Sequence, residues 1–228
     1  MEDRSAILLH GAGVGAWVWD RVQARLAVPS LAPEVGGREV GATPDVVVDS
    51  LMRQIDGFAA GEVVLVAHSL TGVLVSGLAA RLGSRLTHVV YVSAVIPKAN
   101  QSFLSAMGFP MGWVMRVLFL LNPKGLRPSD AMIRDGLCND LDSADAADVV
   151  GRYTPEFPGL YTTAVAGPAQ VRSTYVRLTQ DGSVSLAVQD RMIAGLGTPE
   201  VTELEAGHLP MLSRPDEIAG VIDAAASA

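Results

Sequence analysis

Ser69 stands where the sequence changes from an apolar run to an amphipathic one, in VVLVAHSLTGVLVSGLAARL. Its spacing follows the G-x-S-x-G pattern of a nucleophile elbow, in which a serine occupies a sharp turn between a strand and a helix. Ala67 and Thr71 replace the two glycines of that pattern, and Gly72 follows one residue later. We therefore interpret Ser69 as a candidate nucleophile. The alternative is that it only caps the following helix.

A serine hydroxyl becomes nucleophilic when a neighbouring imidazole accepts its proton. His208, in EAGHLPM, follows one predicted strand and precedes the last predicted helix, which puts it on a loop at a strand's carboxyl end. His10 and His68 are interpreted as structural residues at strand ends, and His88 is expected to be solvated at the start of a strand. His208 is the predicted base, with an exposed loop histidine as the alternative.

The third candidate is Asp181, in VRLTQDG, because a carboxylate can orient the imidazole. Asp181 ends the strand before the one that leads to His208, while its neighbour Gly182 also suits an ordinary turn. Serine, aspartate and histidine in this order, each at the carboxyl end of a strand, favour a catalytic triad. The backbone amides of Ala12 and Leu70 are the predicted donors to the oxyanion of such a reaction.

The loop HGAGVGAW supports a different hypothesis, because Gly11, Gly13 and Ala16 match the G-x-G-x-x-A fingerprint of dinucleotide sites. Such a site needs an acidic residue about 20 positions further on, at the end of the second strand. Only Glu34, in the loop-like LAPEVGG, comes close. The fingerprint also leaves the serine and histidine without a role, so nucleotide binding is the weaker hypothesis.

Short β-rich runs alternate with segments of helical periodicity along the chain. The predicted strands span residues 6–9, 62–67, 87–95, 173–179 and 200–205. Several are almost entirely apolar, as expected when helices cover both faces of a parallel sheet. Helices are predicted over residues 46–60 and 70–82 and from residue 213 toward the end. The sequence therefore predicts an α/β fold with a mostly parallel central sheet flanked by helices.

Residues 98–172 interrupt this alternation with frequent prolines and no convincing strand. We interpret this segment as a small helical cap, and the whole chain, residues 1–228, as a single domain. The apolar stretch from Met107 to Leu121 contains Pro110 and Arg116 and is shorter than a bilayer requires. It is therefore predicted to be a buried or pocket-lining helix.

The composition, with 49% hydrophobic and 18% charged residues, is that of a globular protein. A net charge of -7 without a Lys/Arg cluster argues against nucleic-acid binding. Cys138 is the only cysteine, and the start MEDRSAILLHG lacks a signal-peptide pattern, so a cytoplasmic location is predicted. No metal-ligand spacing occurs. We expect a small-molecule partner, without nucleic acid, membrane, metal or cofactor, and leave homodimer formation open.

Four motifs resemble small α/β-hydrolases related to plant methylesterases and hydroxynitrile lyases. HGAGVGAWVWD is similar to the start of that family's oxyanion loop, YVSAVIP to its strand leading into the cap, YVRLTQDGSV to its acid strand, and AGHLPMLSRPDEI to its histidine loop. The resemblance spans nearly the whole chain. It implies a triad of Ser69, Asp181 and His208, with oxyanion donors at Ala12 and Leu70.

Hydroxynitrile lyases of this type carry a lysine directly after the catalytic histidine, where this chain has Leu209. The resemblance therefore implies an esterase. Ser69 would attack a small, largely apolar ester, a methyl ester being one candidate, and water would release the acid from the acyl-enzyme. Trp113, Phe119 and Leu209 are the predicted substrate-binding residues. Two alternatives stay open: a lactone, cyclisation or other non-hydrolytic reaction at the same triad, and a hydrolase-fold ligand receptor.

Overall fold

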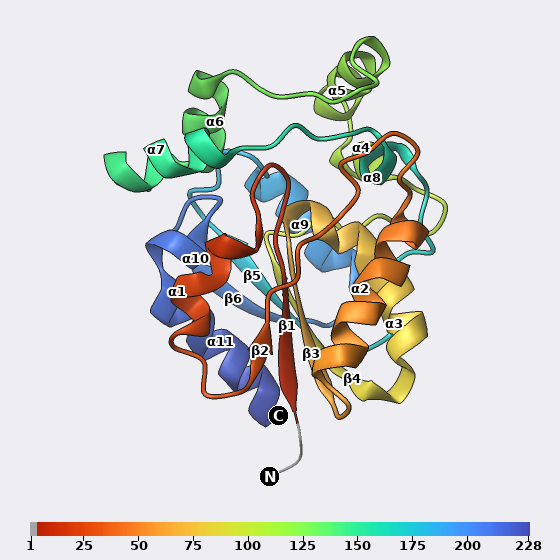
Figure 1. The fold of residues 1–228 in the computed structure, drawn as a ribbon, viewed down its shortest axis with the longest axis vertical. Coiled ribbons are helices and arrows are strands. Elements are labelled where there is room, and N and C mark those ends of the chain that lie inside the picture. The colour runs from red at the N-terminus through yellow and green to blue at the C-terminus, as the bar shows by residue number, and fades with distance from the viewer. Residues whose placement is uncertain (1–3) are drawn as a thin grey trace.

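The computed structural model describes residues 4–228, and within them the chain forms a six-stranded sheet (Figure 1). In chain order the strands are β1 (Ser5–Leu9), β2 (Ser30–Leu31), β3 (Val63–His68), β4 (Leu86–Val92), β5 (Ser173–Leu178) and β6 (Glu200–Leu204). Across the sheet the order is β2-β1-β3-β4-β5-β6, and every neighbouring pair is parallel. The predicted parallel α/β architecture is confirmed.

Helices bury both faces of this sheet, which explains the apolar strands (Figure 1). One face is covered by α1 (Asp20–Gln23) and α11 (Pro215–Ser227), and the other by α2 (Pro44–Phe58), α3 (Val75–Leu82) and α9 (Leu186–Gly195). In β3, Val64 and Val66 pack in the apolar cluster of the first face, whereas Leu65 packs in that of the second. Successive side chains thus point to opposite faces, and each finds an apolar partner.

The local sequence accounts for the longest helix, α2. Its N-cap is Thr43, whose side chain accepts the amide of Val46, and Pro44 occupies the first turn. Val47, Val48, Leu51 and Ile55 are buried and recur on one helical face, so that face packs against the sheet. The predicted helix 46–60 is thus found within two residues of its expected ends.

Two predicted elements differ in detail. β2 is not predicted, because two residues are too few to show a hydrophobic pattern. The predicted helix 70–82 starts as the 3-10 helix η2 (Ser69–Leu74) and becomes α-helical only in α3. His88 is not solvated as expected: it is buried in the interior strand β4, and its Nε2 lies 2.9 Å from the hydroxyl of Thr174.

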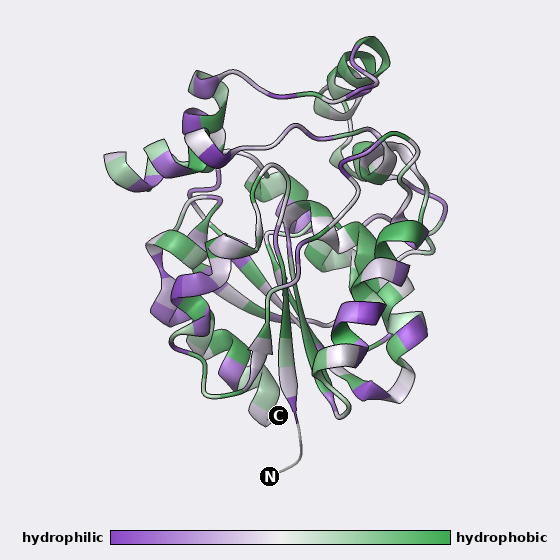
Figure 2. Ribbon diagram, in the orientation of Figure 1, coloured by the Kyte–Doolittle hydropathy of each residue, from purple (hydrophilic) through white to green (hydrophobic). Residues whose placement is uncertain are grey.

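The segment between β4 and β5 lies above the carboxyl ends of the strands (Figure 1). It contains α4 (Phe103–Met107), α5 (Met111–Leu121), α6 (Asp130–Leu137), α7 (Ser143–Arg152) and α8 (Gly159–Thr162), and we call residues 98–172 the cap segment. Figure 2 shows apolar residues along the strands and also over most of α5, which stands out from the body. None of the helices within residues 4–228 is long and apolar enough to cross a membrane.

Candidate active site

β3 ends in a sharp turn at Ser69, which is buried and has a φ of +54°. This conformation is unfavourable for a residue with a side chain, so its surroundings must hold it. The Ser69 carbonyl accepts the Val95 amide at 3.0 Å, and the Thr71 hydroxyl donates to the His68 carbonyl at 2.9 Å. A Cβ on Gly72 would lie 2.3 Å from the Val95 carbonyl oxygen, so the turn needs glycine at that position.

The structure brings Ser69, His208 and Asp181 together at the carboxyl ends of β3, β6 and β5. The Ser69 Oγ lies 3.0 Å from His208 Nε2, and His208 Nδ1 lies 2.7 Å from Asp181 Oδ2. An ionised carboxylate only accepts hydrogen bonds, so Nδ1 carries the proton and Nε2 is left to accept the serine hydroxyl. The arrangement can therefore draw a proton from Ser69.

Four hydrogen bonds to Asp181 support its ionised form. Besides His208, they come from the Ser93 hydroxyl at 2.6 Å and the backbone amides of Ser183 at 2.7 Å and Val184 at 2.8 Å. Burial alone would raise the pKa of Asp181. The charge and hydrogen bond of His208, together with the bonds from Ser93 and Val184, outweigh burial and lower that pKa to about 2. Ser93, at the end of β4, is a site residue for which the sequence analysis names no role.

His68, the residue before Ser69, also contacts the loop that carries His208. Its Nε2 donates to the backbone carbonyl of His208 at 2.8 Å, and the two rings lie 4.8 Å apart. Burial, followed by the nearby charge of His208, lowers the pKa of His68 to about 3, so this ring stays neutral. His68 thus fixes the loop that carries His208.

The loop after β1 packs directly on Ser69. A Cβ on Gly11 would lie 3.0 Å from the Cβ of Ser69, and Ala12 lines the same cavity as Ser69. Among residues 4–228, the Ala12 amide donates no hydrogen bond. Leu70 is in the first turn of η2, where amides have no partner within the helix. Both amides therefore suit the donor role predicted for them.

A buried carboxylate of the cap segment fixes this loop. Glu156 accepts the Gly13 amide at 2.8 Å and Arg38 Nε at 2.9 Å. The guanidinium of Arg38 also donates to the Val14 carbonyl, and the Thr154 amide donates to the Gly13 carbonyl at 2.9 Å. These contacts join residues far apart in sequence, which is why no local motif reveals them.

The corner between α6 and α7 contacts the other two loops of the site. Asn139 Nδ2 donates to the Gln180 carbonyl at 2.7 Å, next to Asp181. Asp140 Oδ2 accepts the Gly207 amide at 2.7 Å, next to His208. The cap segment therefore makes polar contacts with all three loops that surround Ser69.

A cavity of about 270 Å³ opens above Ser69 and His208. Its walls are mainly apolar and carry no Lys, Arg, Asp or Glu; they consist of Ala12, Phe103, Leu104, Met107, Met111, Met115, Pro128, Met132, Ile133, Leu137, Tyr153, Tyr161, Gly182, Ser183 and Val184. Four methionines give flexible, polarisable walls that adapt to different apolar shapes. The cavity suits an uncharged, largely apolar molecule.

The residues predicted to bind substrate lie elsewhere. Trp113 is 62% exposed on the outer side of α5, Phe119 is buried against the ring of Tyr161, and Leu209 is buried in the core beside the histidine loop. Within the described residues, none of these three lines the cavity, which corrects the prediction. α5 instead turns Met111 and Met115 toward it.

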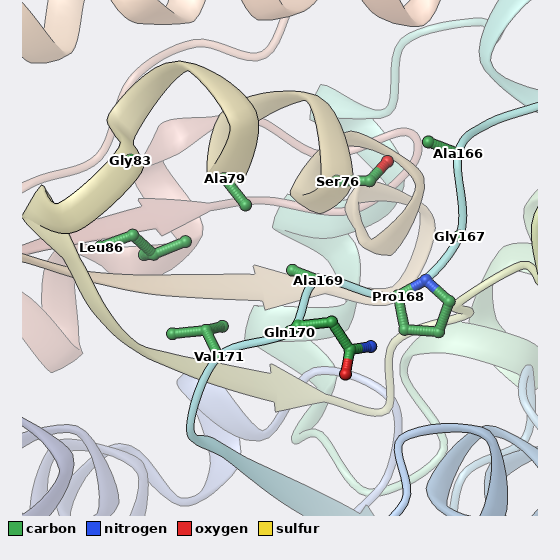
Figure 3. Close-up of a pocket in the computed structure, with 10 residues that line it drawn as sticks. All are labelled: Ser76, Ala79, Gly83, Leu86, Ala166, Gly167, Pro168, Ala169, Gln170 and Val171. Carbon is green, nitrogen blue, oxygen red and sulfur yellow. The ribbon is translucent and has the colours of Figure 1, made fainter.

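A separate cavity of about 360 Å³ lies between α3 and residues 166–171 (Figure 3). Ser76 and Gln170 are its polar side chains, and none of its lining residues titrates near neutral pH. It offers no base for Ser76, so it is not a reaction site of the kind seen at Ser69.

The glycines of the dinucleotide fingerprint serve the packing of the loop after β1. Gly13 has a φ of +74°, and a Cβ there would lie 1.9 Å from the ring of Tyr153. The loop continues into a single 3-10 turn, η1 (Ala16–Trp19), and not into a long helix whose amino end could bind a pyrophosphate. Glu34 accepts the Ala16 amide at 3.0 Å and so holds the loop.

Comparison with known proteins agrees with this fold. A model of the alpha/beta hydrolase family matches residues 6–221. Putative methylesterase 11, chloroplastic, of Arabidopsis thaliana is 25% identical over 244 residues, which cover 96% of this chain and 63% of that protein. Methylesterase 9 of Arabidopsis thaliana is 24% identical over 241 residues, covering 93% of this chain and 94% of that protein.

Among solved structures, an extracellular alpha/beta-hydrolase from a Paenibacillus species has the same fold. That protein is described as sharing structural and functional homology with tobacco salicylic acid binding protein 2. It superposes with a TM-score of 0.86 at 18% identity, covering 97% of this chain and 98% of that chain. With its parallel sheet, its serine at the end of β3 and a family match over nearly its whole length, this chain belongs to the alpha/beta hydrolase family.

Proposed function

We propose that this chain is a serine esterase that hydrolyses a small, uncharged, largely apolar carboxylic ester through an acyl-enzyme. The observation that carries the proposal is the hydrogen-bonded series from Ser69 through His208 to Asp181, at the base of an apolar cavity. Binding alone needs no activated serine, so this series favours an enzyme over a receptor.

The reaction takes place in two halves. In the first, Ser69 Oγ attacks the ester carbonyl carbon while His208 Nε2 takes its proton, and the amides of Ala12 and Leu70 stabilise the oxyanion. His208 then gives that proton to the departing alcohol. In the second half, His208 takes a proton from water, the hydroxide attacks the acyl group, and Ser69 recovers its proton as the acid leaves. Asp181 stays ionised and stabilises the imidazolium in both halves.

The shape and chemistry of the cavity limit the substrate. About 270 Å³ between methionine, aromatic and aliphatic side chains holds a small molecule without bringing a charge near it. The methylesterase relatives make a methyl ester of an apolar acid a reasonable candidate. Leu209, buried next to His208, supplies no cation that could stabilise a departing cyanide.

Hydrolysis of a short-chain nitrophenyl ester by the wild type and by Ser69→Ala tests the proposal. Ser69→Ala should lower kcat on the order of 10⁶-fold, because the nucleophile is removed. Intact mass after treatment with a serine-directed phosphonate should show one adduct on the wild type and none on the variant. Ser76→Ala, in the separate cavity, is the matched control and should keep both properties.

The same pair of measurements separates the alternatives. Labelling without turnover of any ester would mean that the serine is activated for a non-hydrolytic reaction or belongs to a receptor. If the wild type shows no labelling and no turnover, Ser69 is not the nucleophile.

A further inference from the structure

α5 exposes an unusual amount of apolar surface. Of the twelve large apolar side chains that are exposed among residues 4–228, six lie between residues 109 and 121. They are Phe109, Met111, Trp113, Val114, Leu120 and Leu121, with exposures from 42% to 88%. Figure 2 shows this helix as an apolar projection from the top of the molecule. Surface of this kind, gathered on one helix and the turn before it, is typical of an interaction site.

The two sides of α5 have different surroundings. Gly112 and Phe119 are buried, and Met115 lines the cavity above Ser69. Trp113 and Leu120 recur at helical spacing on the opposite side, which no other element of the described chain covers. The helix has 11 residues, or about 16 Å, so it can lie along a surface but cannot span a bilayer.

The charge around this helix points to the partner. Between Lys98 and Asp130 the chain has no Asp or Glu, whereas its net charge is -7. The same stretch contains Arg116, Lys124 and Arg127, of which Arg127 forms an ion pair with Asp130 at 2.8 Å. Arg116 lies on α5, and Lys124 lies just beyond its end and is exposed. An apolar helix face bordered by cations, with a tryptophan on it, is the pattern of a helix that lies in the interface of an anionic membrane.

We propose that α5 binds the surface of an anionic lipid membrane, with Trp113, Leu120 and Leu121 inserted among the lipids and Arg116 and Lys124 at the headgroups. A second copy of this chain is the less suitable partner, because a two-fold contact would bring the same cations together, and residues 99–129 contain no acid to offset them. The sequence predicts no membrane partner because the apolar stretch is too short to span, but an interfacial helix needs no spanning length.

The position of the helix connects this surface to the cavity. Met111 is 52% exposed and also lines the cavity, so apolar side chains continue from the outer face of α5 toward Ser69. A lipid-dissolved ester could pass along them without crossing a charged side chain. Lipid binding itself is separate from the reaction at Ser69, because it is measured without turnover.

Co-sedimentation with vesicles tests the proposal. The wild type should bind vesicles of equal parts phosphatidylcholine and phosphatidylglycerol, and should bind phosphatidylcholine alone much more weakly. Arg116→Gln/Lys124→Gln should weaken binding to the anionic vesicles roughly 25-fold, at roughly fivefold per cation. Leu120→Gln/Leu121→Gln should weaken it on the order of tenfold or more. Tryptophan emission should shift to the blue on binding, because Trp113 is the exposed one of the three tryptophans.

Val40→Gln/Val201→Gln is the matched control, since both side chains are exposed and apolar but lie outside the cap segment. This variant should bind like the wild type. The proposal is overturned if the wild type binds neither kind of vesicle, or if Leu120→Gln/Leu121→Gln binds as well as the wild type. A dimer in sedimentation velocity that this variant abolishes, without vesicle binding by the wild type, would instead make α5 a contact between copies.

Discussion

The carboxylate of Asp181 decides which ring nitrogen of His208 carries the proton. It accepts four hydrogen bonds, and its pKa of about 2 keeps it ionised near neutral pH. Ser93 donates one of those bonds from the end of β4, so the site uses the ends of four neighbouring strands, not three. A polar residue at the end of a strand that adjoins a predicted site strand is therefore worth including among site candidates.

Asp181→Asn should lower kcat by about 10⁴-fold, because a neutral amide neither enforces the Nδ1–H tautomer of His208 nor stabilises the imidazolium. Ser93→Ala should cost far less, since three of the four hydrogen bonds remain. Both are measured as kcat for a nitrophenyl ester, with circular dichroism to confirm folding. Near-wild-type turnover by Asp181→Asn would assign the acid to another residue.

Elements of the cap segment hold the loop that supplies the Ala12 amide. Glu156 accepts one hydrogen bond from that loop and one from Arg38. It lies more than a hundred residues from both partners in sequence. Glu156 does not line the cavity, so it acts on the reaction only by positioning the loop. Sequence patterns reveal which residues share one helix or strand. The contact between Glu156 and the loop after β1 joins distant segments, so it is found only in the folded chain.

Glu156→Gln should lower kcat roughly tenfold with little change in KM, less than the 10²–10³-fold expected for losing an oxyanion donor itself. The amide oxygen can still accept the Gly13 amide, but it cannot balance the charge of Arg38. Arg172→Gln, which removes a surface pair with Glu200, is the control and should change neither constant. An unchanged kcat with a lower Tm would show that Glu156 is merely structural.

The same loop requires glycine at position 13. Gly13→Ala should destabilise the fold by roughly 2–4 kcal/mol, because φ is +74° and the new Cβ would meet the Tyr153 ring at 1.9 Å. Gly151→Ala, in α7 with open space around it, should be neutral or stabilising by up to about 1 kcal/mol. Urea unfolding monitored by fluorescence compares the two. Equal stability of the two variants would mean that the Tyr153 contact relaxes freely.

The whole fold is more predictable than the details of its cap. Apolar strands such as VVLV indicate a parallel sheet directly, because only strands covered on both faces lack polar alternation. Hydrophobic periodicity does not predict the orientation of α5. Its sequence, MGWVMRVLFLL, is apolar on nearly every side, so periodicity cannot tell which side faces the cavity. Trp113, predicted to bind substrate, is exposed on the outer side of α5, and Met111 and Met115 line the cavity instead.

At the scale of the molecule, buried His68 links stability to pH. Its pKa in the folded chain is about 3, below the ordinary 6.5, so between these values the unfolded chain binds a proton that the folded chain does not. Stability from this group is therefore fully present above pH 6.5 and is lost as the pH falls below it. Between pH 7 and pH 5 the loss should be about 2 kcal/mol.

Measuring the free energy of unfolding in urea at pH 7 and pH 5, for the wild type and His68→Gln, checks this dependence. Glutamine has no proton to gain in this range, while its amide can still donate to the His208 carbonyl. The wild type should therefore lose more stability on acidification than His68→Gln, by about 2 kcal/mol. The same loss in both proteins would mean that His68 is protonated in the folded chain, and that its hydrogen bond to the histidine loop survives with a charged ring.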